Sequence, residues 1–149
     1  MSEKIESITS FKSAGEYFGL STMVIRHILE RTTITNVPLA KPYYMGIVNN
    51  HGNMIPVIAF RKLIGVETDE PQPEASIIVV SVDDENTSLL GFFVDEVYDV
   101  FDANVETLDK NVVLNIDNSL TKTMKGSLKY DDKFVYLIDM QEMSNILEK

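Results

Sequence analysis

The chain has 149 residues, no cysteine and a formal net charge of −10 at pH 7, from 23 acidic and 13 basic residues. Without cysteine there is no disulfide, thiolate metal site or cysteine nucleophile, and a chain of this length can bury a core of its own. The acidic balance opposes binding to phosphate backbones, and no apolar run reaches the roughly 18 residues that span a membrane. We therefore expect a single domain, residues 1–149, that neither binds nucleic acid nor inserts directly into a membrane.

The N-terminal third predicts a leader, a strand, a helix and an extended segment. Residues 1–10 are of mixed polarity without the apolar core of a signal peptide, which favours a frayed leader on a cytoplasmic protein. After a short strand, Ser21 is a candidate helix cap, and apolar residues at a 3.6-residue period predict a short helix over residues 23–30. Residues 32–37 are rich in β-branched side chains and precede Pro38, which is typical of an extended segment.

The stretch over residues 45–65, MGIVNNHGNMIPVIAFRKLIG, predicts a hairpin followed by a short helix, because turn formers at 49–53 separate two apolar runs. Residues 67–75 are acidic with two prolines, and we interpret the chain near 66–75 as a connector between two halves. The nearly unbroken apolar run at 76–82 predicts a strand that is buried on both faces.

The C-terminal region predicts a second hairpin and a closing helix. Asp139 and Glu142 have the spacing of a capping box, and apolar residues at helical spacing follow them. Residues 112–116 are a candidate strand. The acidic clusters at 83–85 and 131–132 lie between strand-like runs, where turn formation is favoured over metal binding.

An internal repeat connects the two halves. One constant offset aligns Gly19 with Gly91 and Ile25 with Val97, and a second, slightly larger offset aligns residues 46–63 with residues 126–143 without a gap. Two units in the same order favour duplication, and many short strands with close turns favour barrels over an open sheet.

The sequence contains no motif typical of a catalytic, phosphate-binding or metal-binding site. The sequence has no Gly-rich phosphate loop, nucleophile elbow or calcium-loop spacing. His27 and His51 have no carboxylate or nucleophile placed beside them, so we interpret His27 as a partly exposed helix residue and His51 as a turn residue. Met124, Met140 and Met143 are expected to fill the core. The sequence thus predicts a binding module rather than an enzyme, with no cofactor and no bound metal.

Five segments in order resemble the CheW-type chemotaxis coupling proteins. The run GIVNNHGNMIPVIAFRKLIG resembles the family's Gly-apolar-apolar-Asn-Leu-Arg-Gly turn and Pro-Val-Ile-Asp-Leu strand. The other four are FGLSTMVIRHIL, residues 35–38, GFFVDEVYDVF and MKGSLKYDDKFVYLIDM, so the resemblance covers about residues 10–148. It implies a mostly β fold of two linked five-stranded SH3-like barrels with short helices and a C-terminal helix.

The resemblance also implies a function without catalysis. Such proteins join the cytoplasmic tip of chemoreceptors to the regulatory domain of the chemotaxis histidine kinase in receptor arrays. The receptor contacts the groove between the barrels, and the matching positions here are Ile25, Gly46 and Asn49. The expected protein is a cytoplasmic adaptor that is recruited to membrane receptor arrays.

The chain departs from the family pattern at four positions. His27 stands where Glu is usual, Asn50 where Leu is usual, His51 where Arg is usual and Ala59 where Asp is usual. Because an arginine fork makes hydrogen bonds worth about 1.5–3 kcal/mol each, its loss predicts a receptor surface adapted to a different tip. Two alternatives remain: a diverged CheW-fold module or decoy in another sensory system, and a small-ligand-binding barrel or enzyme.

Overall fold

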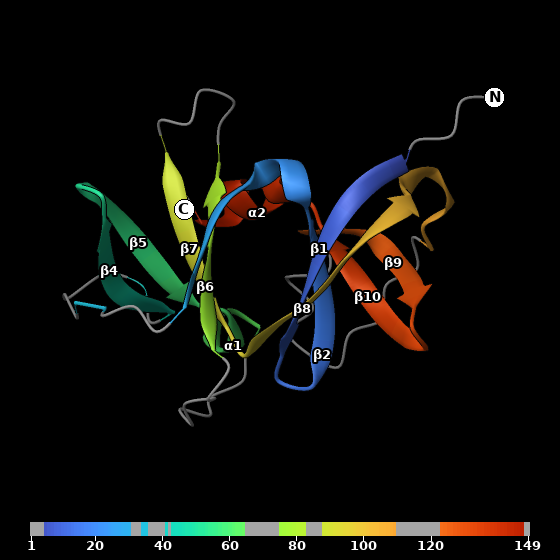
Figure 1. Ribbon diagram of the computed structural model, residues 1–149, viewed down its shortest axis with the longest axis horizontal. Coiled ribbons are helices and arrows are strands. Elements are labelled where there is room, and N and C mark those ends of the chain that lie inside the picture. The colour runs from blue at the N-terminus through green and yellow to red at the C-terminus, as the bar shows by residue number, and fades with distance from the viewer. Residues whose placement is uncertain are drawn as a thin grey trace.

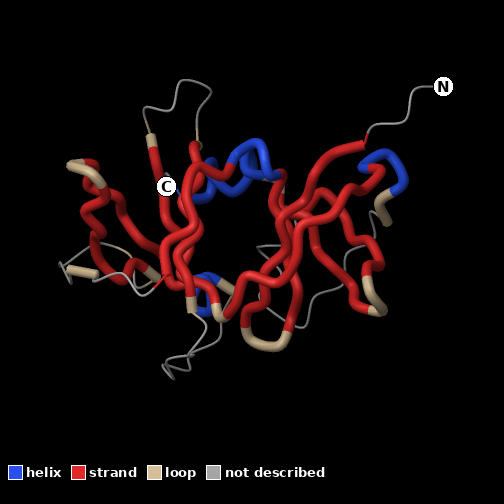
Figure 2. The backbone as a smooth tube through the Cα atoms, in the orientation of Figure 1, coloured by secondary structure: helices blue, strands red, loops and turns tan. Residues whose placement is uncertain are grey.

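The computed structural model describes residues 5–30, 34–35, 41, 43–64, 75–82, 88–109 and 123–147. Strands dominate this part of the chain, and its helices are short (Figure 1, Figure 2). In chain order the elements are β1 (Ile5–Ser13), β2 (Glu16–Ser21), η1 (Thr22–Val24), β3 (Ile25–Glu30), β4 (Tyr44–Asn50), β5 (Asn53–Ala59), α1 (Phe60–Leu63), β6 (Ser76–Ser81), β7 (Leu89–Val94), β8 (Glu96–Asn104), η2 (Val105–Thr107), β9 (Met124–Tyr130), β10 (Lys133–Ile138) and α2 (Met140–Leu147).

The strands of the described residues form two five-stranded sheets that lie side by side (Figure 1). The first barrel has the order β8-β1-β2-β10-β9, and the second barrel has the order β3-β6-β7-β5-β4. In each, a residue beyond one edge strand bridges to the other edge strand: Thr35 pairs with Ile47, and Asp109 pairs with Ser127. The predicted mostly β fold of two five-stranded halves with a C-terminal helix is confirmed.

The two barrels exchange strands. The chain leaves the first barrel after β2, passes through η1 and enters the second barrel as β3. It returns at Asp95, between β7 and β8. The passage does not occur at the connector expected near residues 66–75, because β5 before it and β6 after it belong to the same sheet. That expectation is therefore wrong about where the halves join.

Several predicted segments lie outside the described residues. These are the connector up to residue 74, the turn at 83–87, the candidate strand at 112–116 and most of the extended segment at 32–37.

Residues 23–30 are not the predicted helix. They form the end of η1 and then β3, which pairs antiparallel with β6. The pairing register shifts between Ile25 and His27. Such a β-bulge adds a residue and breaks the two-residue alternation of a strand. Ile25, Ile28 and Leu29 have helical spacing in the sequence but do not share a buried face: Ile25 and Leu29 pack against different hydrophobic clusters, and Ile28 is 43% exposed.

Residues 5–10 are not part of a frayed leader, because they belong to β1, which pairs with both β2 and β8. Its polar sequence conceals this position. Thr9 is 2% exposed and Ser10 is fully buried. The Ser10 hydroxyl donates to the Asp99 carbonyl at 2.8 Å and accepts from the Asp99 amide at 3.0 Å. A hydroxyl with hydrogen-bond partners of this kind can be buried without the free-energy penalty of an unpaired polar group.

The predicted hairpin repeat is present in the pairing register. Gly46 pairs with Val57, and the equivalent Gly126 pairs with Leu137. Both glycines lie at a register shift, with φ angles of 152° and 156° that L side chains rarely adopt. Both hairpins turn through two residues with positive φ, His51–Gly52 and Asp131–Asp132. Such turns match the twist of paired strands.

The repeat that aligns Gly19 with Gly91 is also present. Gly19 lies in the parallel pairing of β2 with β10, and Gly91 in the parallel pairing of β7 with β5. A Cβ on Gly19 would lie 2.7 Å from Ile8 Cγ2, and one on Gly91 would lie 2.8 Å from Ile77 Cγ2. The strands that follow, β3 and β8, carry matching bulges. The chain is therefore built from two copies of one unit.

The largest hydrophobic cluster of the described residues lies between the barrels and draws residues from both. Phe60, at the start of α1, lies at its centre: its ring is 5.0 Å from Phe11, 4.8 Å from Phe18 and 5.8 Å from Phe92. All four rings are fully buried. Smaller clusters fill the barrels themselves. The barrels therefore share a core and pack as one unit.

The closing helix is confirmed. Asp139 Oδ1 accepts hydrogen bonds from the amides of Gln141 at 3.0 Å and Glu142 at 3.3 Å. The Asp139 amide donates to the Thr123 carbonyl at 2.6 Å, so the second half of the capping box is replaced by a tertiary contact. Met143 and Met124 are buried as expected, whereas Met140 is only half-buried.

Candidate functional site

A groove of about 700 Å³ lies between the barrels and is lined by residues of η1, the start of β3 and α2. In Figure 1, α2 is labelled at the top centre. It forms at one of the two places where the chain passes between barrels. The residues that line it are Ser21, Met23, Val24, Arg26, Ser81, Val82, Lys125, Ile138, Asp139, Met140, Gln141, Ser144 and Asn145.

The groove combines apolar surface with positive charge. Met23 is 80% exposed, and Met140 is half-buried. The ionisable residues on its walls are Arg26, Lys125 and Asp139, of which the carboxylate already accepts the amides that cap α2. Two cations against one engaged carboxylate is unusual for a chain of net charge −10. The arrangement suits a helix that has an apolar face and carboxylates beside it.

Four of the six predicted site residues lie on the β4–β5 hairpin. Gly46 is buried at the bulge, and Asn49 Oδ1 accepts the Gly52 amide at 3.0 Å, which supports the turn. His51 is exposed at the turn with a φ of 53°, as its interpretation as a turn residue predicts. Asn50 is half-buried opposite Asn53. Gly46 and Asn49 thus fix the backbone shape of the hairpin.

The other two predicted site residues lie on β3. Ile25 is half-buried against the shared core, opposite Val80. His27 is exposed and opposite Val79, so it is a strand residue and not the helix residue expected from the spacing. None of the six predicted residues lines the groove, but Ile25 lies between Val24 and Arg26, which do.

β3 and β4 are the two edge strands of the second barrel, and the free edge of β4 pairs with Thr35 rather than with β3. The predicted site residues therefore form two groups, one on the β4–β5 hairpin and the other, Ile25 and His27, on β3. No pairing in the described chain joins the two groups. Sequence reasoning missed Met23, Arg26 and Gln141 as groove residues because it assigned the first two to a helix and made no prediction for the third.

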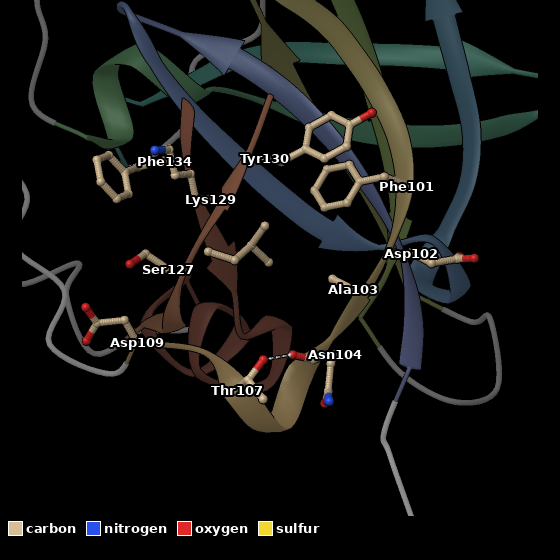
Figure 3. Close-up of a pocket in the computed structure, with 11 residues that line it drawn as sticks. Phe101, Asp102, Ala103, Asn104, Thr107, Asp109, Ser127, Lys129, Tyr130 and Phe134 are labelled. Carbon is tan, nitrogen blue, oxygen red and sulfur yellow. Dashed lines mark hydrogen bonds between the residues drawn. The ribbon is translucent and has the colours of Figure 1, made fainter. Parts of the chain in front are cut away.

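A second cleft, of about 470 Å³, opens on the first barrel between β8 and β9 (Figure 3). The rings of Phe101 and Tyr130 stack above it, 3.8 Å apart and nearly parallel at 7°. Phe134 on its rim is 63% exposed. Thr107 Oγ1 donates to the Asn104 carbonyl at 3.0 Å at the other end, which closes the strand into η2.

Two tyrosine–aspartate hydrogen bonds cross from β8 to the β9–β10 hairpin beside this cleft. The Tyr130 hydroxyl donates to Asp99 Oδ2 at 2.6 Å, and the Tyr98 hydroxyl donates to Asp131 Oδ2 at 2.7 Å. The bond to the Asp131 carboxylate raises the pKa of Tyr98 to about 12, and the bond to Asp99 raises the pKa of Tyr130. Lys133 Nζ lies 5.6 Å from the centre of the Tyr98 ring.

At the other passage between barrels, Asp95 forms a clasp with Arg61. Arg61 Nε donates to Asp95 Oδ1 at 2.8 Å, and Arg61 Nη2 donates to Oδ2 at 2.7 Å. Asp95 Oδ2 also accepts the Ala14 amide at 3.0 Å. This two-pronged pair joins α1, the β1–β2 turn and the return of the chain. The ion pair therefore connects the first barrel to the second at this passage.

Within the described segments, no group of three or more histidine and acidic residues is close enough to hold a metal ion. The helices found there are also too short or too polar to cross a bilayer.

Comparison with known proteins identifies a family. Residues 7–148 match the model described as CheW-like domain. The chain is similar to the chemotaxis protein CheW of Thermotoga maritima, with 26% identity over 136 residues, which is 91% of this chain and 85% of that protein. It is similar to the chemotaxis protein CheW of Bacillus subtilis, with 28% identity over 123 residues, covering 80% of this chain and 77% of that protein.

Among solved structures, the chain is similar to the crystal structure of the scaffolding protein TtCheW from Thermoanaerobacter tengcongensis. The TM-score is 0.78 with 26% sequence identity, and the match covers 91% of this chain and 89% of that one. The resemblance found in the sequence motifs, including the SH3-like form of the two barrels, is confirmed.

Proposed function

Since this chain belongs to the CheW-like domain family of non-catalytic chemotaxis scaffolds, we propose that it joins the cytoplasmic tip of chemoreceptors to the regulatory domain of a chemotaxis histidine kinase. The observation that carries the proposal is the match over residues 7–148 to the family model, on a fold that superimposes over nine-tenths of its length. The chain acts as one unit in the cytoplasm and reaches the membrane through receptor arrays.

The inter-barrel groove and the neighbouring rim of the second barrel are the receptor surface in this proposal. The groove offers the apolar side chains of Met23 and Met140 beside the positive charge of Arg26 and Lys125. A receptor tip is a helical hairpin, and a helix with an apolar stripe and acidic flanks matches this chemistry. Ile25 lies beside the groove, and Gly46 and Asn49 set the shape of the hairpin at the rim.

His27 and His51 adapt this surface to a receptor tip that differs from the family's usual one. Both are exposed, and the family pattern has a charged residue at each position, Glu at that of His27 and Arg at that of His51. The two histidines therefore replace one carboxylate and one rigid five-donor guanidinium. In this proposal the kinase interface is less affected by the change than the receptor surface.

The test is direct binding of the purified chain to its own kinase regulatory domain and to receptor cytoplasmic fragments on vesicles. The chain is expected to bind both. His51→Arg is expected to weaken binding to its own receptor and to strengthen binding to a receptor with the usual tip, by about tenfold in each direction. Asn53→Ala, on the same hairpin beyond the turn, is the control.

Unchanged binding of both receptors by His51→Arg would refute the adaptation. Failure of the unmodified chain to bind the kinase would refute the adaptor and favour a diverged module in another sensory system.

A further inference from the structure

The two passages between barrels are equivalent positions of the internal repeat. The alignment that matches Gly19 with Gly91 also matches Met23, in η1, with Asp95. The alignment that matches the two hairpins also matches Gln141, in α2, with Arg61, in α1. At each passage, the repeat thus relates one residue on the crossing segment to the second residue of the short helix.

The two passages differ in what fills these positions. At the β7–β8 passage the pair is Asp95 and Arg61, which form two hydrogen bonds of 2.8 and 2.7 Å with only 11% and 20% of their side chains exposed. At the β2–β3 passage the pair is Met23 and Gln141, both exposed, and both line the groove of about 700 Å³. Methionine and glutamine cannot form an ion pair.

We propose that Met23 and Gln141 are the positions that keep the groove open, and that Met23 is the apolar contact for the receptor helix that occupies it. This inference rests on the proposed function for the identity of the occupant. An unbranched methionine adapts to the shape of an incoming side chain. At 80% exposure, Met23 has most of its apolar surface available for burial by a partner.

The charges of the groove select the kind of helix. Arg26 and Lys125 flank the apolar surface that includes Met23 and Val24. In a chain of net charge −10, this local excess of positive charge favours a helix with glutamate or aspartate beside its apolar stripe. At the β7–β8 passage, the equivalent carboxylate and guanidinium form hydrogen bonds with one another and are largely buried.

The experiment introduces at positions 23 and 141 the aspartate and arginine that form the ion pair at the other passage. Met23→Asp, Gln141→Arg and the double variant form a cycle that is read by chemical denaturation and by binding to two probes. The probes are a receptor cytoplasmic fragment on vesicles and the kinase regulatory domain. The control is Val100→Asp, because Val100 is also an exposed apolar residue, at 55%, but lies on β8 of the first barrel, outside the groove and away from the β4–β5 hairpin.

We expect the double variant to be more stable than the sum of its single substitutions predicts, with the excess decreasing at high salt. We expect its receptor affinity to fall about tenfold or more, which corresponds to losing the burial of one large apolar side chain. Its kinase affinity should stay unchanged, and Val100→Asp should leave both affinities unchanged.

Additive stabilities in the cycle would show that the two positions do not face one another as Asp95 and Arg61 do, and would overturn the inference. Receptor binding by the double variant at full affinity would overturn the role of Met23. If the unmodified chain binds no receptor, the proposed function fails and the named occupant fails with it. The stability cycle needs no partner, so it still decides whether positions 23 and 141 are close enough to form the ion pair that Asp95 and Arg61 form.

Discussion

In the first barrel, Tyr98 and Tyr130 each donate a hydrogen bond to an aspartate across the gap between β8 and the β9–β10 hairpin, to Asp131 and Asp99 respectively. The repeat places these four residues at the same backbone positions as four residues of the second barrel. In that barrel they are Arg26, His27, Asn50 and His51.

The second set cannot make tyrosine–carboxylate bonds, because it has no carboxylate and no phenol. Arg26, His27 and His51 are instead exposed. The comparison teaches that one barrel uses its rim for internal support, whereas the other presents cationic and imidazole groups to solvent. Three of these four positions are among those where the chain departs from the family pattern. The duplicated backbone is shared, and the side chains at its rim have diverged in function.

The largest expected effect tests whether the duplicated helices contribute equally to the core. Phe60 and Met140 are equivalent in the repeat, but Phe60 is fully buried and Met140 is half-buried at the groove. Phe60→Ala should lower the free energy of unfolding by about 3–5 kcal/mol, and Met140→Ala by about 1–2 kcal/mol. Urea denaturation measures both. Equal losses would show that the shared core does not depend on Phe60.

The next effect compares the two passages between barrels. Asp95→Ala leaves Arg61 and the Ala14 amide without their shared acceptor. It should destabilise the chain by about 3 kcal/mol, at the low end for a buried pair because Arg61 stays partly exposed. Met23→Ala, at the equivalent exposed position, should change stability by less than about 0.5 kcal/mol. Thermal unfolding of the two variants side by side provides the measurement; a loss for Met23→Ala as large as that for Asp95→Ala would contradict the account.

The smallest effect concerns the rim of the first barrel and depends on pH. Because the Asp131 carboxylate raises the pKa of Tyr98 to about 12, from 10.0 in the absence of the bond, the bond favours the folded state below about pH 10. That contribution is lost as the pH rises through the folded pKa. Tyrosine absorbance, compared between the unmodified chain and Tyr98→Phe, should show that the substitution removes a phenol that ionises near pH 12. Loss of a phenol that ionises near pH 10 would refute the hydrogen bond.

Some of this structure could be predicted from the sequence because local signals agree with the tertiary fold. The β4–β5 hairpin is marked by turn formers between apolar runs, and Asp139 marks the start of α2. The repeat was detectable because Gly19 and Gly91 must admit a neighbouring side chain at under 3.0 Å from where a Cβ would lie.

Other parts were concealed for physical reasons. β1 is buried through hydroxyls, such as Ser10, that are satisfied by backbone groups in β8, so its sequence resembles that of a polar leader. β3 contains a bulge that interrupts the two-residue alternation typical of a strand, and its apolar residues Ile25, Ile28 and Leu29 have helical spacing in the sequence. The family resemblance implied a groove between the barrels, but the residues that line it could not be predicted, because its walls come from η1 and α2, which meet only after the barrels have exchanged strands. The motif positions identified the family, while the groove residues required the fold.

The central claim is that this chain couples a receptor to a kinase, and reconstitution tests it most directly. Receptor cytoplasmic fragments on vesicles are combined with the kinase, with and without the chain, and the kinase that sediments with the vesicles and its autophosphorylation rate are measured. The account predicts that the chain is required for the kinase to sediment and for its activity to depend on the receptor. Kinase that sediments to the same extent and has the same activity without the chain would contradict the account.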